Sequence, residues 1–155
     1  MCEYNSNFRS RINGENEKII QELISEFSKI GRLNKFIQCI ILTGSRSKGD
    51  FNIYSDADII IIGNWATKNF LDRIDELRSY INKLNIHIPI DYFCYTPKEI
   101  ESLIENANPL ILDAIDSGIC IYNEQFFKKL KSNLNEKIEK KLIIRTPTFW
   151  KSNID

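Results

Sequence analysis

Apolar positions recur along the chain in two different patterns, which predict alternating helices and strands. In residues 15–30 the apolar side chains fall at helical spacing, and Gly31 follows as a natural C-terminal stop. The runs FIQCIILTG (36–44) and ADIIIIG (57–63) are continuously apolar, which suits strands of a sheet covered on both faces. Residues 66–84 carry a second helical stripe between these strands and the next apolar run.

A third strand is predicted over IDYFCY (90–95), after Pro89, which cannot donate to a strand ladder and marks the entry. Thr96, Pro97 and Glu99 then form the capping-box start of a short helix. The chain therefore keeps alternating between helix and strand in its second half.

Another short helix is predicted over PLILDAIDS (109–117), where Gly118 closes it, and ICIY (119–122) follows as a short fourth strand. An amphipathic helix runs on through about Leu142, and the last stretch, 143–155, has no clear periodicity. This order predicts an α/β (α+β) fold with a mixed sheet of about four strands flanked by helices.

Length and composition favour one compact domain over residues 1–155, with a core at about 15–123 and a C-terminal helix and tail at 124–155. Basic and acidic residues number 21 each, so no global field favours nucleic acid or a membrane surface. The four cysteines show no zinc spacing and are interpreted as buried, reduced thiols. No signal peptide or apolar stretch of about 20 residues is present, which predicts a cytoplasmic protein without a membrane partner.

The segment between the first two strands carries residue types that bind phosphate. Gly44 and Ser45 stand where the first strand ends and the chain must turn. A glycine lets the backbone approach a phosphate, and the N–H groups of a following helix start would face the anion. The Ser45 hydroxyl adds a donor, and Arg46 and Lys48 can neutralise phosphate charge.

Three acids are placed to hold a cation. If Ala57 and Asp58 begin the strand ADIIII, the carboxylates of Asp56 and Asp58 project from the same face, roughly 6–7 Å apart. An Asp is unfavourable in a β-run, so Asp91 at the start of the third strand is explained if it faces the same metal. One or two Mg²⁺ ions on these acids would clamp an in-line phosphoryl displacement, and Asp91 can take the proton of the attacking hydroxyl.

The spacing of these residues resembles the GSx3Gx5SDxD signature of the polymerase-β-type nucleotidyltransferase superfamily. Gly44-Ser45 is followed after three residues by Gly49, and after five more by Ser55-Asp56 and then Asp58. Asp91 in PIDYF is placed like the third carboxylate of that family. The resemblance is greatest to the minimal nucleotidyltransferase (MNT) branch, whose stand-alone members also carry a segment similar to NPLILDAIDSGICIYN. The loop DFNIY is less basic than in many relatives.

The resemblance implies a nucleotidyltransferase fold, Mg²⁺, and ATP or another nucleoside triphosphate as substrate. Catalytic and metal-binding roles fall on Asp56, Asp58 and Asp91. The nucleotide-binding residues it implies are Gly44, Ser45, Arg46, Lys48, Gly49 and Ser55. It further implies an antitoxin of the HEPN/MNT type, which transfers AMP to a tyrosine of a HEPN-type toxin.

Each site residue also has an ordinary structural interpretation. Gly44 and Gly49 can form a simple surface loop, and Asp56 and Asp58 can be solvated acids at a strand start. Asp91 can cap a turn after Pro89.

The same applies to the remaining polar residues and to the tail. Arg46 and Lys48 can be solvated loop charges, and Ser55 can cap the turn without touching substrate. His87, the one histidine, is interpreted as non-functional. The tail aromatics Phe149 and Trp150 either fold back onto the body or dock a partner.

Other functions remain as alternatives. One is nucleotidyl transfer to a small-molecule acceptor, and another is a non-catalytic module that binds nucleotide or masks a toxin. Nucleic-acid polymerisation is disfavoured by the neutral charge. The sequence leaves the acceptor, the base and the number of metals open, and it leaves a homo-oligomer possible.

Overall fold

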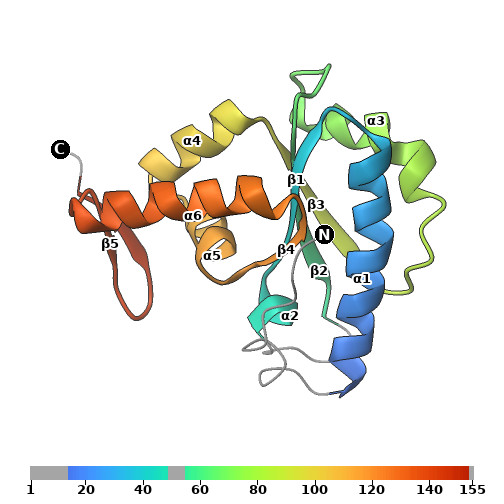
Figure 1. The fold of residues 1–155 in the computed structure, drawn as a ribbon, viewed down its shortest axis with the longest axis horizontal. Coiled ribbons are helices and arrows are strands. Elements are labelled where there is room, and N and C mark those ends of the chain that lie inside the picture. Colours follow the sequence, from blue (N-terminus) through green and yellow to red (C-terminus); the bar gives the residue numbers. More distant parts are fainter. Residues whose placement is uncertain (1–13, 49–54, 154–155) are drawn as a thin grey trace.

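The computed structural model describes residues 14–48 and 55–153. Helices and strands alternate along most of this chain (Figure 1). In chain order the elements are α1 (Gly14–Leu33), β1 (Ile37–Thr43), α2 (Ser45–Lys48), β2 (Ala57–Gly63), the 3₁₀ turn η2 (Phe70–Asp72), α3 (Arg73–Ile81), β3 (Ile90–Tyr95), α4 (Pro97–Glu105), α5 (Pro109–Ser117), β4 (Ile119–Tyr122), α6 (Glu124–Glu139), β5 (Ile143–Arg145) and β6 (Trp150–Ser152).

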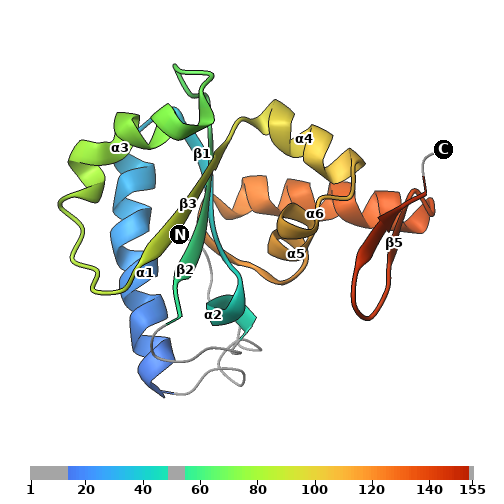
Figure 2. The same ribbon diagram turned by 180° about the vertical axis from the view of Figure 1, so that it is seen from behind.

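The four longer strands form one mixed sheet in the order β3-β2-β1-β4. Strand β1 is antiparallel to both β2 and β4, whereas β2 and β3 run parallel. Helices α1 and α3 lie on one side of the sheet and α4, α5 and α6 on the other (Figure 2). The α/β class and the mixed four-stranded sheet predicted from the sequence are thus confirmed.

Both faces of the sheet are buried, which explains why β1 and β2 are apolar at nearly every position. Successive side chains of a strand point to opposite faces. Ile59 and Ile61 therefore join the core beneath α1, while Ile60 and Ile62 join the core beneath α4–α6. The same alternation decides which face each polar residue of β2 and β3 occupies.

Helix α1 does not stop at Gly31 as the sequence suggested, but continues to Leu33. The glycine has a packing role instead of a capping role. It is buried, and a Cβ at this position would overlap with the ring of Tyr122 at the end of β4. Gly31 therefore allows α1 to approach the sheet closely.

The helix predicted over 66–84 is shorter in the structure, where α3 covers Arg73–Ile81 after a 3₁₀ turn. Side chains compete for the backbone groups that would have extended it. Glu76 Oε1 accepts a hydrogen bond from Thr67 N at 2.8 Å, and Asn69 Oδ1 accepts one from Leu71 N at 3.0 Å. Such local bonds favour a capped turn over further helix.

The two short helices after β3 begin as predicted. Thr96 and Glu99 form a complete capping box on α4, and the Asn108 side chain caps α5 by accepting from Ile111 N at 3.2 Å. Each helix carries a proline in its first turn. No helix in residues 14–48 or 55–153 combines the length and apolarity needed to cross a bilayer.

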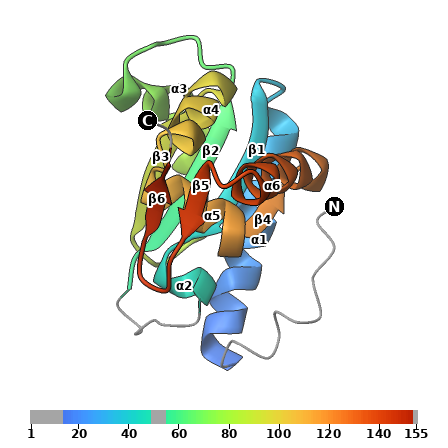
Figure 3. The same cartoon turned by 90° about the vertical axis from the view of Figure 1, so that its left-hand side faces the viewer.

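The unpatterned tail forms a hairpin, β5–β6, that folds back onto α5 (Figure 3). Trp150 is buried, and its Nε1 donates to Asp113 Oδ1 at 2.9 Å. Arg145 forms an ion pair with Asp116 at 2.8 Å and lies over the Trp150 ring. Phe149, by contrast, is 56% exposed. Three-residue strands are too short for their periodicity to be recognised in a sequence.

Candidate active site

The acids come from two neighbouring parallel strands. Asp58 lies directly opposite Asp91 in the register of β2 and β3. Since Ala57 and Ile59 face the core beneath α1, Asp58 and its partner lie on the other face, at the end of the sheet where α2 lies (Figure 1). Asp56 precedes β2 and is exposed, as is Asp91, whereas Asp58 is half-buried.

The carboxylate of Asp58 is influenced by burial and by the two other acids. Burial raises the pKa of Asp58, and repulsion from the charges of Asp91 and then Asp56 raises it further. Like charges held together in this way favour either a proton or a bound cation. The end of the sheet is therefore a natural place for a positive ion.

Gly44 lies against the central acid. It adopts a φ of 80°, in the left-handed region, directly after β1. A Cβ at this position would overlap with Oδ2 of Asp58. Glycine is thus required both by the turn and by the close approach of the carboxylate.

The short helix α2 follows this turn at once. Ser45 is its first residue and is half-buried, and Ser47 Oγ donates to the carbonyl oxygen of Gly44 at 2.8 Å. Lys48 is the last residue of α2, while Gly49 lies outside the described residues. The structure thus joins Gly44 and Ser45 to the acids at one end of the sheet.

Arg46 is placed differently from the expectation that its side chain contacts phosphate. Its side chain is fully buried, where Nε donates to Ser55 O at 2.9 Å and Nη1 donates to Asn16 Oδ1 at 3.0 Å. Burial lowers the pKa of the Arg46 guanidinium, and the nearby charge of Asp56 opposes that shift. In this structure Arg46 is bonded into the scaffold beside the acids.

Asn16 is a site-supporting residue that the sequence analysis missed. It is buried in the first turn of α1, and its Nδ2 donates to the backbone carbonyl of Arg46 at 3.3 Å. A lone asparagine near a helix start is ordinary in a sequence. No signal in a single sequence distinguishes it from a solvated polar residue.

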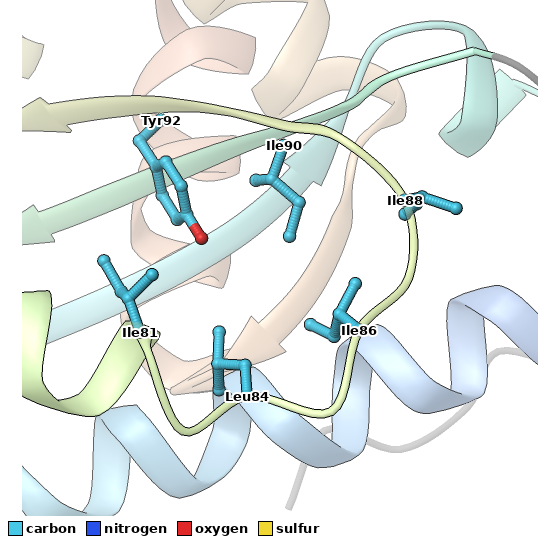
Figure 4. A pocket seen from close by; sticks show the side chains of 6 residues that line it. All are labelled: Ile81, Leu84, Ile86, Ile88, Ile90 and Tyr92. Carbon is cyan, nitrogen blue, oxygen red and sulfur yellow. The ribbon is translucent and has the colours of Figure 1, made fainter.

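Loop 82–89 and β3 border a small cavity of about 150 Å³ on the other face of the sheet (Figure 4). The side chains that line it are apolar apart from the hydroxyl of one tyrosine, and belong to Ile81, Leu84, Ile86, Ile88, Ile90 and Tyr92. Asp91 lies between Ile90 and Tyr92 on the strand and so faces away from this cavity. His87 is exposed on the same loop.

The sequence profile of a family described as "Nucleotidyltransferase domain" matches residues 17–145, which include both acid-bearing strands. The chain belongs to this family. The match confirms the superfamily recognised from the sequence motif and the assignment as a nucleotidyltransferase. No curated protein sequence matches this nucleotidyltransferase.

Several solved structures are similar to this chain. A candidate nucleotidyltransferase from Sulfolobus solfataricus is 13% identical, with a TM-score of 0.50 over 81% of this chain and 95% of its own. A toxin–antitoxin structure with AMP-PNP is 17% identical, with a TM-score of 0.43 over 81% and 87% of the two chains. A complex of tri-AMPylated Shewanella oneidensis HEPN toxin with MNT antitoxin is 16% identical, with a TM-score of 0.35 over 81% and 89%.

The carboxylates at this end of the sheet suit a cation that takes few of its ligands from the protein. Within residues 14–48 and 55–153, no three His, Cys, Asp or Glu side chains form a ready-made metal centre. Mg²⁺ commonly binds through one or two carboxylates and completes its shell with water and substrate phosphate. The mutually repelling oxygens of Asp58 and Asp91 fit an ion that arrives with a triphosphate.

Proposed function

We propose that this nucleotidyltransferase transfers a nucleoside monophosphate, AMP from ATP, to an acceptor hydroxyl and releases pyrophosphate. The observation that carries the proposal is the pairing of Asp58 with Asp91 across β2 and β3, beside the Gly44 turn. Like charges that repel one another cost stability unless something compensates them, and a metal–triphosphate complex is a compensating partner.

The acids have distinct places in the reaction. Asp56, Asp58 and Asp91 would hold Mg²⁺, which would neutralise charge on the triphosphate and polarise the α-phosphate. Asp91, exposed at the start of β3, accepts the proton of the acceptor hydroxyl. The hydroxyl oxygen forms a bond to the α-phosphorus, and the bond from that phosphorus to the bridging oxygen breaks, so that pyrophosphate leaves.

The Gly44 turn and α2 contribute positioning. The turn brings Ser45 to the same end of the sheet as the acids, and its hydroxyl donates to a phosphate oxygen in the proposed complex. Lys48 and Gly49 complete this phosphate-binding segment in the proposal, as the family motif implies. Phosphoryl transfer depends mainly on alignment and charge neutralisation. The role of this turn in the proposal is therefore to align the phosphates with the acids.

The proposed acceptor is a tyrosine hydroxyl on a HEPN-type toxin, with this chain acting as its antitoxin. The resemblance of the Gly44–Asp58 motif to the MNT branch supports it. A tyrosine on another protein would also present its hydroxyl at the exposed Asp91 without a deep acceptor pocket on this chain.

The test combines the purified protein with α-labelled ATP, Mg²⁺ and lysate of its native host. Alongside run an Asp56→Asn/Asp58→Asn double variant and an Asp72→Asn control, which removes an exposed acid whose side chain makes no helix-cap hydrogen bond. We expect label on one protein band, lost in the double variant and on adding EDTA but kept in the control.

Other outcomes separate the alternatives. Label on a small molecule would replace the protein acceptor by a small-molecule one. Nucleotide binding without transfer, with each of the four triphosphates in turn, would contradict catalysis and support a binding or toxin-masking module.

A further inference from the structure

Arg46 is the charged side chain whose position most needs an explanation. It belongs to a four-residue helix next to the acids, yet it is 0% exposed. Removing a guanidinium from water is expensive unless its donors are satisfied in a fixed geometry. The contacts of Arg46 therefore indicate what that burial achieves.

These contacts join three segments that are distant in the sequence. Through Nη1 and its own carbonyl, Arg46 exchanges two hydrogen bonds with Asn16 in the first turn of α1. Through Nε it donates to the carbonyl of Ser55, nine residues further along the chain. One side chain thus connects α1, α2 and the backbone that leads into β2.

The bond to Ser55 acts directly on the acids. The Ser55 carbonyl belongs to the peptide unit whose nitrogen is that of Asp56, and this unit is planar. The hydrogen bond of 2.9 Å from Nε to this oxygen restricts the orientation of the peptide plane. It therefore also restricts the direction in which the side chain of Asp56 projects. Asp56 itself is not part of a strand, and the nearest ladder bond, from Ala57 N to Pro89 O at 3.0 Å, holds the peptide unit on its other side.

We propose that Arg46, itself held by Asn16, is a positioning residue that orients Asp56 for the metal–nucleotide complex and does not contact the nucleotide. The inference rests on the proposed function for the meaning of the acids, but its geometry rests on the hydrogen bonds alone. Its positive charge also attracts the nearby charge of Asp56.

A second buried arginine provides a matched control. Arg73 is 2% exposed, and its guanidinium donates to Glu99 and to the carbonyl of Cys94. It supports α3, β3 and α4, whereas Arg46 supports the segment that carries Asp56. Changing either arginine to lysine keeps the charge and removes the planar guanidinium. A difference in Mn²⁺ binding between the two variants therefore reflects where each arginine lies relative to the acids.

The experiment measures Mn²⁺ binding by electron paramagnetic resonance, with and without a non-hydrolysable ATP analogue, together with melting temperature and transfer kinetics. The variants are Arg46→Lys, Asn16→Leu, Asn16→Asp and Arg73→Lys. Asn16→Leu removes both the acceptor for Nη1 and the donor to the Arg46 carbonyl, while Asn16→Asp keeps the acceptor alone and is a partial rescue. Asn16 variants leave Arg46 in place, so they test the proposal even if Arg46→Lys does not fold.

We expect Arg46→Lys and Asn16→Leu to weaken Mn²⁺ binding about tenfold, as is typical when a partner that orients a metal ligand is lost. They should lower kcat, because a misplaced Asp56 acts on the reacting groups, and KM for ATP should rise by no more than the loss of Mn²⁺ affinity. Asn16→Asp should bind Mn²⁺ more tightly than Asn16→Leu, and Arg73→Lys should lower the melting temperature without changing Mn²⁺ affinity.

A raised KM for ATP with unchanged kcat in Arg46→Lys would overturn the proposal, since it would indicate direct contact with the nucleotide. Equal loss of stability in Arg46→Lys and Arg73→Lys, with unchanged Mn²⁺ binding in both, would also overturn it. If the wild type transfers no nucleotide but binds Mn²⁺ more tightly than Arg46→Lys, the proposed function fails and the positioning role stands.

Discussion

Gly44 and Asp58 are packed so closely that no side chain fits between them. Gly44 has a φ of 80°, and a Cβ on it would occupy the space of Asp58 Oδ2. The turn after β1 and the central acid of β2 are thus one packing unit, since their backbones are also neighbours across the β1–β2 ladder. A side chain added at Gly44 must therefore displace the carboxylate of Asp58.

The first prediction concerns Gly44→Ala. Alanine at a positive φ destabilises a fold by about 1 kcal/mol or more, and the overlap with the carboxylate adds to this. We expect at least a tenfold loss of transfer activity, because Asp58 must move. Urea unfolding and steady-state kinetics measure the two effects. Gly14→Ala is the control, since a Cβ there meets nothing within 4 Å; an unaffected Gly44→Ala would contradict the packing argument.

The second prediction concerns Asp91→Asn, which removes the proposed proton acceptor without changing its size. Loss of a general base lowers kcat by about 10²–10⁴-fold. We expect a fall in that range, and Asp91 is exposed, so the melting temperature should change little. Single-turnover transfer of labelled AMP measures it, with Asp72→Asn beside it. Activity within twofold of wild type would exclude Asp91 as the base.

The third prediction concerns acid stability and the Arg73–Glu99 pair. Hydrogen bonds from Arg73, at 2.6 and 2.8 Å, lower the pKa of Glu99 below its usual 4.5. The unfolded chain therefore takes up this proton at a higher pH than the folded protein does. It follows that the free energy of unfolding decreases as the pH falls from 4.5 through the lowered pKa.

Urea titrations between pH 6 and pH 3 measure this dependence, and Glu99→Gln should flatten it over that window. Glu101→Gln, an exposed change on the same helix, should leave the slope as in the wild type. Identical slopes for the wild type and Glu99→Gln would show that the pair does not contribute.

The fourth prediction concerns the C-terminal hairpin. Trp150→Ala removes a buried ring and the hydrogen bond to Asp113, so it should lower the free energy of unfolding by about 3 kcal/mol. Phe149→Ala, at the exposed neighbouring position, should change it by no more than about 0.5 kcal/mol. Urea unfolding of both variants decides the matter. Equal effects would mean that the hairpin is not docked through Trp150.

The parts of the fold that were predictable are those with long apolar runs or explicit caps. Strands β1 and β2 are buried on both faces, and α4 and α5 begin with capping side chains and prolines, so local chemistry alone specifies them. Gly31 was misread because its role depends on Tyr122, which is 91 positions away. Residues in the hairpin are stabilised by contacts with α5 and carry no period of their own.

The candidate site divides in the same way. Asp56 and Asp58 were predicted together from their spacing, and Asp91 was added because an Asp is unfavourable in a β-run and matches the position of the family's third carboxylate. Arg46 was expected at the phosphate because a sequence shows its charge but not its burial. Asn16 gave no signal, since only the folded chain brings the start of α1 to α2.

Helix α1 is fixed at both ends by contacts of different kinds, to Tyr122 through Gly31 and to Arg46 through Asn16. Fifteen residues separate these points, or about 22 Å along a rigid helix. A side chain larger than hydrogen at position 31 would overlap with the Tyr122 ring, so that ring or the C-terminal end of α1 must shift. A shift of the helix also moves Asn16, so we expect a substitution at Gly31 to disturb the position of the acids at the other end of α1. The packing of α1 against β4 thus limits which residues are compatible with an intact site.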